Sequence, residues 1–132
     1  MRDEAQLWWE QSQADYDNAR RVKDLEQWYL VAFLVQQACE KALKAVHVEV
    51  NRALPDRTHS LIKLGKTVSV PDSILSHLRR INADYISTRY PDVDGVAPKD
   101  AYDESMIDER LSYAAEVMEW AETKLSTTSN EA

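Results

Sequence analysis

The segment from Gln27 to Val50 constrains the fold more than any other part of this sequence. It contains an unbroken apolar run, Trp28–Val35, and continues with Ala38, Ala42 and Ala45 at spacings of four and three. A helix that is apolar on nearly every side belongs at the centre of a bundle, and small residues on one stripe let a neighbouring helix come close. We therefore predict a central helix over residues 27–50.

The rest of the chain also favours helix. Glycine is scarce, while Ala, Leu, Glu, Gln, Lys and Arg are abundant. Periodic apolar positions predict further helices at residues 3–23, at 59–68 with Thr58 as the N-cap, from Pro71 to about residue 85, and from about residue 103 onward. The predicted fold class is all-α, an up-and-down bundle of four main helices plus a short helix. The bundle is expected to span residues 1–126, followed by a polar C-terminal tail at 127–132.

Charge is distributed unevenly along the chain. The net charge of −7 argues against broad nonspecific binding to nucleic acid. Residues 41–66, however, carry six basic side chains against two acidic ones, whereas residues 92–132 carry three against eleven. An anionic ligand is therefore expected to meet the middle of the chain rather than its acidic C-terminal third.

Signals of secretion or membrane insertion are missing from the sequence. Cys39 is the single cysteine, so a disulfide framework is excluded and a reducing cytoplasm is the simplest compartment. The longest apolar run, Trp28–Val35, is far too short to cross a bilayer. We expect a cytoplasmic protein with no membrane partner.

Four polar side chains share one face of the predicted central helix. Gln37, Glu40, Lys41 and Lys44 lie within about 100° of one another on a helical wheel. Such a patch on an apolar helix is a candidate ligand site. A solvated stripe, stabilised by pairing of Glu40 with Lys44 at i, i+4, explains the pattern equally well.

The histidines and glycines limit the chemistry that the sequence can support. His59 either packs near the start of a short helix or supplies a site group that titrates near neutral pH. His47 and His77 are expected at exposed helix positions. The histidines are isolated, so no metal site is expected, and Gly65 and Gly95 cannot build a glycine-rich phosphate loop. No cofactor is expected beyond a nucleotide held as a ligand.

A polar loop follows the fourth predicted helix and opens with Arg89, Tyr90, Pro91 and Asp92. It places a guanidinium, a phenol and a carboxylate close together, and loops on rigid scaffolds often carry function. The same residues are also ordinary turn chemistry, because proline fixes φ and Asp bonds to nearby backbone amides. The loop is longer than most connections in helical bundles, which is typical of functional or disordered segments.

Four stretches of the sequence form a pattern that covers nearly the whole chain. They are Ala14-Asp15-Tyr16-Asp17-Asn18-Ala19, the run from Ala32 to Ala45, Thr58-His59-Ser60-Leu61 and Thr88-Arg89-Tyr90-Pro91-Asp92. In order and spacing they resemble the HEPN (higher eukaryotes and prokaryotes nucleotide-binding) domains, in their short stand-alone prokaryotic form. The resemblance implies a helical bundle that dimerises through its long helices and associates with nucleotides or RNA. It also implies a minimal nucleotidyltransferase as a frequent partner.

Many members of this family are metal-independent ribonucleases with Arg-x(4–6)-His near the start of the last long helix. In such a site His acts as acid or base, and Arg stabilises the charge of the phosphorane. No histidine follows Arg89 in this chain. Arg52 and His59 do satisfy the spacing, but they flank the connector at Pro55, so self-contained RNA cleavage is not the favoured function.

The leading hypothesis is a HEPN module that binds a nucleotide or RNA phosphate and works as a homodimer. Arginine suits bidentate phosphate contact and lysine acts as a point charge. The ligand-binding residues would be Gln37, Lys41, Lys44, His59 and Arg89, with Tyr90 stacking or hydrogen-bonding and Asp92 orienting Arg89. Two alternatives stay open: a toxin-like metal-independent ribonuclease of a toxin–antitoxin pair, using Arg52 and His59, and a purely structural dimeric partner protein.

Overall fold

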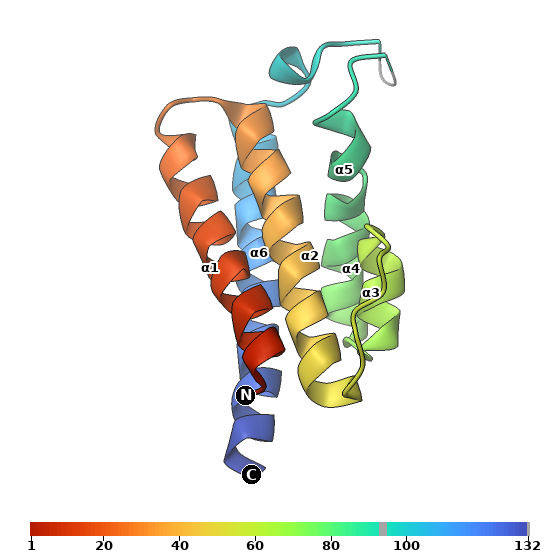
Figure 1. Ribbon diagram of the computed structural model, residues 1–132. Coiled ribbons are helices and arrows are strands. Elements are labelled where there is room, and N and C mark those ends of the chain that lie inside the picture. Colours follow the sequence, from red (N-terminus) through yellow and green to blue (C-terminus); the bar gives the residue numbers. More distant parts are fainter. Residues whose placement is uncertain (93–94, 132) are drawn as a thin grey trace.

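The computed structural model of the chain describes residues 1–92 and 95–131, the last five by their backbone alone (Figure 1). Its elements are α1 (Asp3–Lys23), α2 (Trp28–Asn51), α3 (Leu61–Thr67), α4 (Asp72–Asn82), α5 (Asp84–Ser87), the 3-10 turn η1 (Pro98–Asp100) and α6 (Glu104–Glu131). The described residues contain no strand, which confirms the all-α class. The up-and-down order is also confirmed: α1, α2, α4 and α6 alternate in direction, and both termini lie at one end (Figure 1).

Helix α2 is the central element, as its apolar sequence predicts. Helix α1 packs along it on one side, and α6 lies behind it in Figure 1. Val35, Ala38 and Leu43 of α2 are completely buried, and Ser12 of α1 donates to the Ala38 carbonyl at 2.8 Å. Burying a Val or Leu side chain contributes about 1.5–3 kcal/mol. The alanine stripe therefore brings α1 close, and the larger side chains of α2 hold the bundle together.

The start of α3 differs from the prediction. Its N-cap is Ser60 rather than Thr58, because the Ser60 hydroxyl accepts from the Lys63 amide at 3.2 Å. The Thr58 hydroxyl accepts from the Ser60 amide at 3.1 Å instead. The helix consequently begins at Leu61, and His59 lies in the non-helical segment before it.

The fourth predicted helix is divided into two. Pro71 is the extended N-cap of α4 (φ −64°, ψ 159°) and not its first helical residue. The helix ends at Asn82, and α5 forms a separate turn that contains Tyr85. The break separates Tyr85 from Ile74, Leu78 and Ile81, the buried residues of α4. The Tyr85 ring is therefore not part of that apolar face and can contribute to a polar site.

A buried ionic cluster fastens α5 and the following loop to α6. Asp84 is 2% exposed; its Oδ2 accepts from Arg110 Nε at 2.7 Å and its Oδ1 accepts from the Tyr102 hydroxyl at 2.9 Å. Burial raises the pKa of Asp84, and the hydrogen bond and charge of Arg110 offset only part of that effect. Burial also raises the pKa of Tyr102, with the Asp84 charge adding to the rise. The loop therefore starts beside Asp84 and returns to it at Tyr102.

Helix α6 continues to Glu131. Residue 132 lies outside the described residues, as do the side chains at 127–131, so the polar tail at 127–132 and the boundary at residue 126 stay predictions. Neither α6 nor any other helix within residues 1–92 and 95–131 combines the length and apolar character needed to span a membrane.

Candidate functional site

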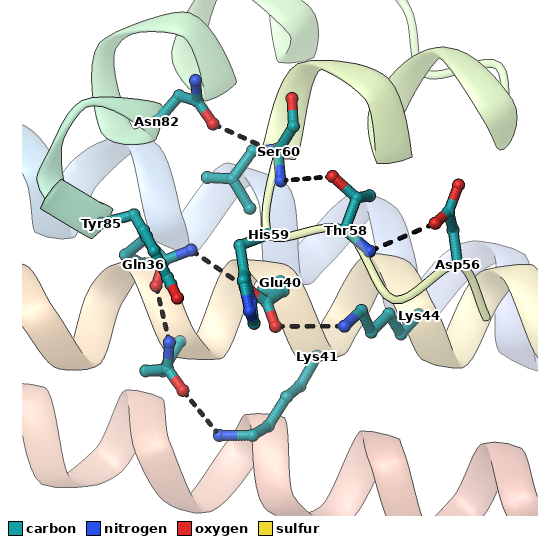
Figure 2. Close-up of polar contacts among 12 residues, drawn as sticks. Gln36, Glu40, Lys41, Lys44, Asp56, Thr58, His59, Ser60, Asn82 and Tyr85 are labelled. Atoms are coloured by element: carbon teal, nitrogen blue, oxygen red, sulfur yellow. Dashed lines mark hydrogen bonds and ion pairs between the residues drawn. The ribbon is translucent and has the colours of Figure 1, made fainter.

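The polar side chains of α2 converge on the carboxylate of Glu40 (Figure 2). Gln36 Nε2 donates to Oε1 at 3.1 Å, Lys44 Nζ donates to Oε2 at 3.2 Å, and His59 Nδ1 lies 3.1 Å from Oε1. Glu40 and Lys44 are each only 5% exposed. An amide, an ammonium and an imidazole thus surround the carboxylate and compensate for its removal from water.

This burial excludes the solvated stripe as the explanation of the α2 patch. Glu40 and Lys44 do pair at i, i+4, but inside the protein. Trp8 of α1 lies next to the ammonium, with Lys44 Nζ 5.4 Å from its ring centroid. Removing one partner of a buried pair costs about 3–5 kcal/mol, because it leaves the other charge uncompensated. The buried Glu40–Lys44 pair therefore fixes the positions of the polar side chains around it on α2.

Gln37 and Lys41 extend this network towards α1. Gln37 Nε2 donates to Gln36 Oε1 at 2.7 Å, and Lys41 Nζ lies 3.4 Å from Gln37 Oε1 (Figure 2). Lys41 Nζ also forms an ion pair with Asp15 Oδ2 at 2.5 Å. The charge of Lys41 is therefore matched within the protein, although 21% of its side chain stays exposed.

Arg89 is held between two aromatic rings. Its Cζ lies 3.9 Å from the ring centroid of Tyr85 and 4.6 Å from that of Phe33, and Nη1 donates to the Tyr85 carbonyl at 2.8 Å. That bond uses one of the five guanidinium N–H donors, so the others can donate to a carboxylate or phosphate. Because the side chain is already fixed, it loses little conformational freedom when it binds a ligand.

His59 stacks on the same tyrosine. The His59 and Tyr85 ring centroids are 4.5 Å apart, and the planes differ by 16°. Nδ1 faces Glu40, so Nε2 points away from the carboxylate, and 51% of the side chain is exposed. Arg89 and His59 are far apart in the sequence, and the fold brings both into contact with the ring of Tyr85, next to the Glu40 network.

Local hydrogen bonds fix the non-helical segment that carries His59. The Thr58 hydroxyl accepts from the Ser60 amide, and Asn82 Oδ1 at the end of α4 accepts from the Leu61 amide at 2.9 Å (Figure 2). These bonds tie the segment to α3 and α4 on the side that faces α2. The His59 ring is therefore positioned by the backbone as well as by Glu40.

Tyr90 and Asp92 lie at the outer edge of this arrangement. Tyr90 is 50% exposed, and Asp92 is exposed. Within residues 1–92 and 95–131, no hydrogen bond or ion pair joins Asp92 to Arg89. The ring and carbonyl of Tyr85 contact Arg89 instead, and the role of Asp92 in orienting Arg89 stays a prediction.

Arg52 and His59 are not brought together. Arg52 is the left-handed C-cap of α2 (φ 54°), whereas His59 contacts Glu40. Residues 40 and 52 are 12 positions apart, which corresponds to about 18 Å along a helix axis. Arg52 instead lines a shallow pocket of about 370 Å³ with Arg2 and Leu54. The fold thus gives this alternative catalytic pair no common site.

Several aromatic and histidine side chains lie where the sequence did not predict them. In the sequence, Tyr85 follows the apolar spacing of the fourth predicted helix, so it looks like a core residue and not like part of a site. Its position four residues before Arg89 is the sequence feature that could have indicated a contact between the two side chains. His77 is 18% exposed, not at an open position: it stacks on Tyr113 with centroids 4.4 Å apart, and its Nε2 lies 2.7 Å from Glu116.

Metal and thiol chemistry are not evident in the described part of the chain. No group of three or more His, Cys, Asp or Glu side chains there is arranged to hold a metal ion. Cys39 is fully buried, and burial raises the pKa of its thiol to about 12. The chemistry available near the Glu40 network is therefore that of Arg89 and His59.

The protein is thus a small all-α bundle whose apolar central helix carries a buried polar network next to Arg89 and His59. The chain matches the HEPN domain over residues 5–124 and belongs to that family. TT1696 from Thermus thermophilus is 28% identical with a TM-score of 0.86, and the alignment covers 94% of this chain and 100% of that one. ST0689, described as an archaeal HEPN homologue, is 30% identical with a TM-score of 0.80 over 92% and 97% of the two chains. No curated protein matches the chain.

Proposed function

We propose that this HEPN protein is a homodimeric module that binds a nucleotide or RNA phosphate where Arg89, Tyr85 and His59 stack. Arg89 carries the proposal, because its guanidinium is held between two rings and can offer parallel N–H donors to phosphate oxygens. His59 adds a donor from Nε2 when that nitrogen is protonated. Membership of the HEPN family supports the ligand class.

The other predicted ligand residues take different parts in this proposal. Lys44 neutralises Glu40 and thereby supports His59. Lys41 and Gln37 are partly exposed at the edge of the network, where a second phosphate of a longer ligand would meet them. Tyr90 is exposed next to Arg89, and an aromatic ring there can stack on a base.

Equilibrium titration with ATP, GTP and short RNA tests the site. Arg89→Ala removes the phosphate donors and should weaken binding about tenfold or more, since a hydrogen bond between charged groups contributes about 1.5–3 kcal/mol. Arg89→Lys keeps the charge without the planar fork and should restore only part of the affinity. Arg79→Ala, at an exposed position of α4, is the matched control. An affinity unchanged by Arg89→Ala would refute the site assignment.

Exposed apolar side chains support the homodimer. Leu7 of α1 is 67% exposed, Leu30 of α2 36% and Ile86 of α5 46%. Leu7 and Trp8 also line a shallow pocket of about 350 Å³. Covering these side chains in a dimer would be favourable, because apolar surface removed from water contributes about 25 cal/mol per Å². Light scattering at micromolar concentration should give the mass of a dimer; the mass of a monomer would refute this part of the proposal.

A minimal nucleotidyltransferase is the partner protein that we propose, and a reducing cytoplasm is the compartment. Family membership supports the partner, and a single buried cysteine supports the compartment. The partner is tested by mixing the chain with a minimal nucleotidyltransferase encoded beside its gene. The mixture should elute from a sizing column as one complex. Separate elution of the two proteins at micromolar concentration would refute the proposal of this partner.

The pairing of His59 with Glu40 favours one second candidate, a metal-independent ribonuclease acting as a toxin. The carboxylate fixes Nδ1, which leaves Nε2 to act as acid or base, while Arg89 would stabilise charge on the phosphate. Incubation with total RNA in EDTA tests it. Cleavage lost in His59→Ala but kept in Arg52→Ala would establish the enzyme. An absence of both cleavage and ligand binding would leave the purely structural dimeric partner.

A further inference from the structure

A second concave surface lies between α1 and α6, away from the Glu40 network. It encloses about 270 Å³. Its floor is formed by Trp9 of α1 and Met118 of α6, which are 7% and 8% exposed. The remaining lining residues are Gln13, Tyr16 and Asp17 from α1 and Ala115, Glu119 and Glu122 from α6. We call this surface the α1–α6 groove.

The lining of the groove is acidic. Asp17, Glu119 and Glu122 are all exposed at its rim, and the described residues that line it include no basic side chain. Among the side chains that the structure describes, none forms an ion pair with these three carboxylates. Asp17 also lines a neighbouring pocket with Arg20 and Arg21, so the negative potential of the groove comes mainly from Glu119 and Glu122 of α6, above an aromatic and thioether floor.

Cations of the chain itself already contact α6 and Tyr16. Lys23 of α1 reaches across to α6, where its Nζ bonds Asp108 Oδ1 at 2.6 Å. The Arg20 guanidinium lies 5.8 Å from the ring centroid of Tyr16, a groove residue. The same pair of helices thus binds an ammonium to a carboxylate and a guanidinium against an aromatic face. The Tyr16 ring of the groove therefore already contacts a cation of the chain, whereas the carboxylates of Glu119 and Glu122 have no such contact among the described side chains.

We propose that the α1–α6 groove is a docking site for a basic segment of a partner protein, which inserts a lysine or arginine side chain. The alkyl stem would cover Trp9 and Met118, since long basic side chains bury their methylenes on apolar surface. The charged head would lie among Asp17, Glu119 and Glu122 and would replace Arg20 against the Tyr16 ring, where it would make a cation–π contact. Nucleic acid is excluded as the occupant, because its phosphates would meet three carboxylates.

The groove and the proposed phosphate site are independent of each other. The groove is built by α1 and α6, whereas Arg89 and His59 belong to the segments around α5 and α3. Loss of nucleotide binding would therefore leave the groove proposal intact, and the reverse also holds. The two sites also select opposite charges, so one probe cannot report on both.

The test uses the full chain and a fluorescein-labelled peptide in which arginine and serine alternate over about twelve residues, roughly the length of chain that spans a standard interface. Fluorescence anisotropy measures binding to the wild type, to Glu119→Gln/Glu122→Gln and to Glu10→Gln/Glu26→Gln. Both double variants remove two exposed charges, but Glu10 and Glu26 lie outside the groove. We expect the groove variant to bind about tenfold more weakly, as the loss of a charge-assisted contact predicts, and the control to change less than about twofold. An equal loss in both variants, or no loss, would overturn the proposal.

A second variant and two further measurements settle which occupant the groove takes. Tyr16→Leu keeps apolar volume but removes the aromatic face. It should therefore weaken binding of the peptide while leaving the helicity measured by circular dichroism unchanged. Spermidine should displace the peptide poorly; displacement at equal concentration would reassign the groove to small polyamines. The groove variant should keep the wild-type mass by sedimentation, and a change in mass would reassign the groove to contact between copies of this chain.

Discussion

Replacement of Arg110 by methionine offers the sharpest test of the buried cluster that holds the loop. The side chains of Asp84 and Arg110 are 3% and 11% exposed, so neither charge is well solvated. Methionine keeps much of the apolar stem but removes the guanidinium that bonds Asp84 Oδ2 at 2.7 Å. The carboxylate would then keep the Tyr102 hydroxyl, at 2.9 Å, as the remaining side-chain partner in this cluster.

The expected loss follows from these contacts. Breaking one half of a buried ion pair costs about 3–5 kcal/mol. The Tyr102 hydrogen bond survives, and Glu109, which Arg110 also contacts, keeps Arg80 Nη2 at 3.2 Å. We therefore expect the lower end of the range, about 3 kcal/mol, which for a domain of this size lowers Tm by roughly 10 °C.

The loss should depend on pH with a defined sign. Burial raises the pKa of Asp84 in the folded state above the ordinary value of 3.8, so the folded state holds this proton more tightly than the unfolded state. Stability then falls as pH rises from the unfolded pKa to the folded pKa, and the cost is absent below both. Without Arg110 the folded pKa rises further. The loss caused by Arg110→Met should therefore shrink as the solution is acidified.

Urea denaturation followed by circular dichroism, at neutral pH and at successively lower pH towards the ordinary carboxyl value of 3.8, measures this effect. Arg79→Met, at an exposed position of α4, is the matched control and should stay within about 0.5 kcal/mol of wild type. Asp84→Asn combined with Arg110→Met should recover part of the loss, because the uncompensated charge is gone. A loss no larger than that of the control, or one that grows on acidification, would refute the reasoning.

Three further outcomes are expected elsewhere in the molecule. The buried Cys39 thiol, whose pKa burial raises to about 12, should resist a thiol reagent in mildly alkaline buffer until the protein is unfolded in urea. Ser60→Ala should cost about 1 kcal/mol in urea denaturation, because it removes the N-cap of α3, and a larger loss from Thr58→Val would contradict the observed cap. Lys44→Met should cost about 3 kcal/mol by leaving Glu40 buried without its ammonium, whereas Lys66→Met, at an exposed position, should be nearly neutral.

Helix positions could be predicted where the signal is local. The predicted α1 coincides with the observed Asp3–Lys23, and the predicted α2 agrees with the observed helix to within one residue at each end. Both follow from apolar periodicity, which a single segment displays without its neighbours. The predicted start of α3 is wrong because Thr58 and Ser60 carry equivalent hydroxyls, and only the backbone path decides which of them caps the helix.

By itself, the sequence determined that the chain is an all-α bundle with α2 at its centre, and it located the polar residues of α2 and the Arg89 loop. Those features depend on spacing along the chain. Only the tertiary structure decided that Lys44 is buried with Glu40 and that His59 and Arg89 stack on Tyr85. Burial and stacking are properties of surfaces contributed by distant segments, so no pattern within one segment contains them.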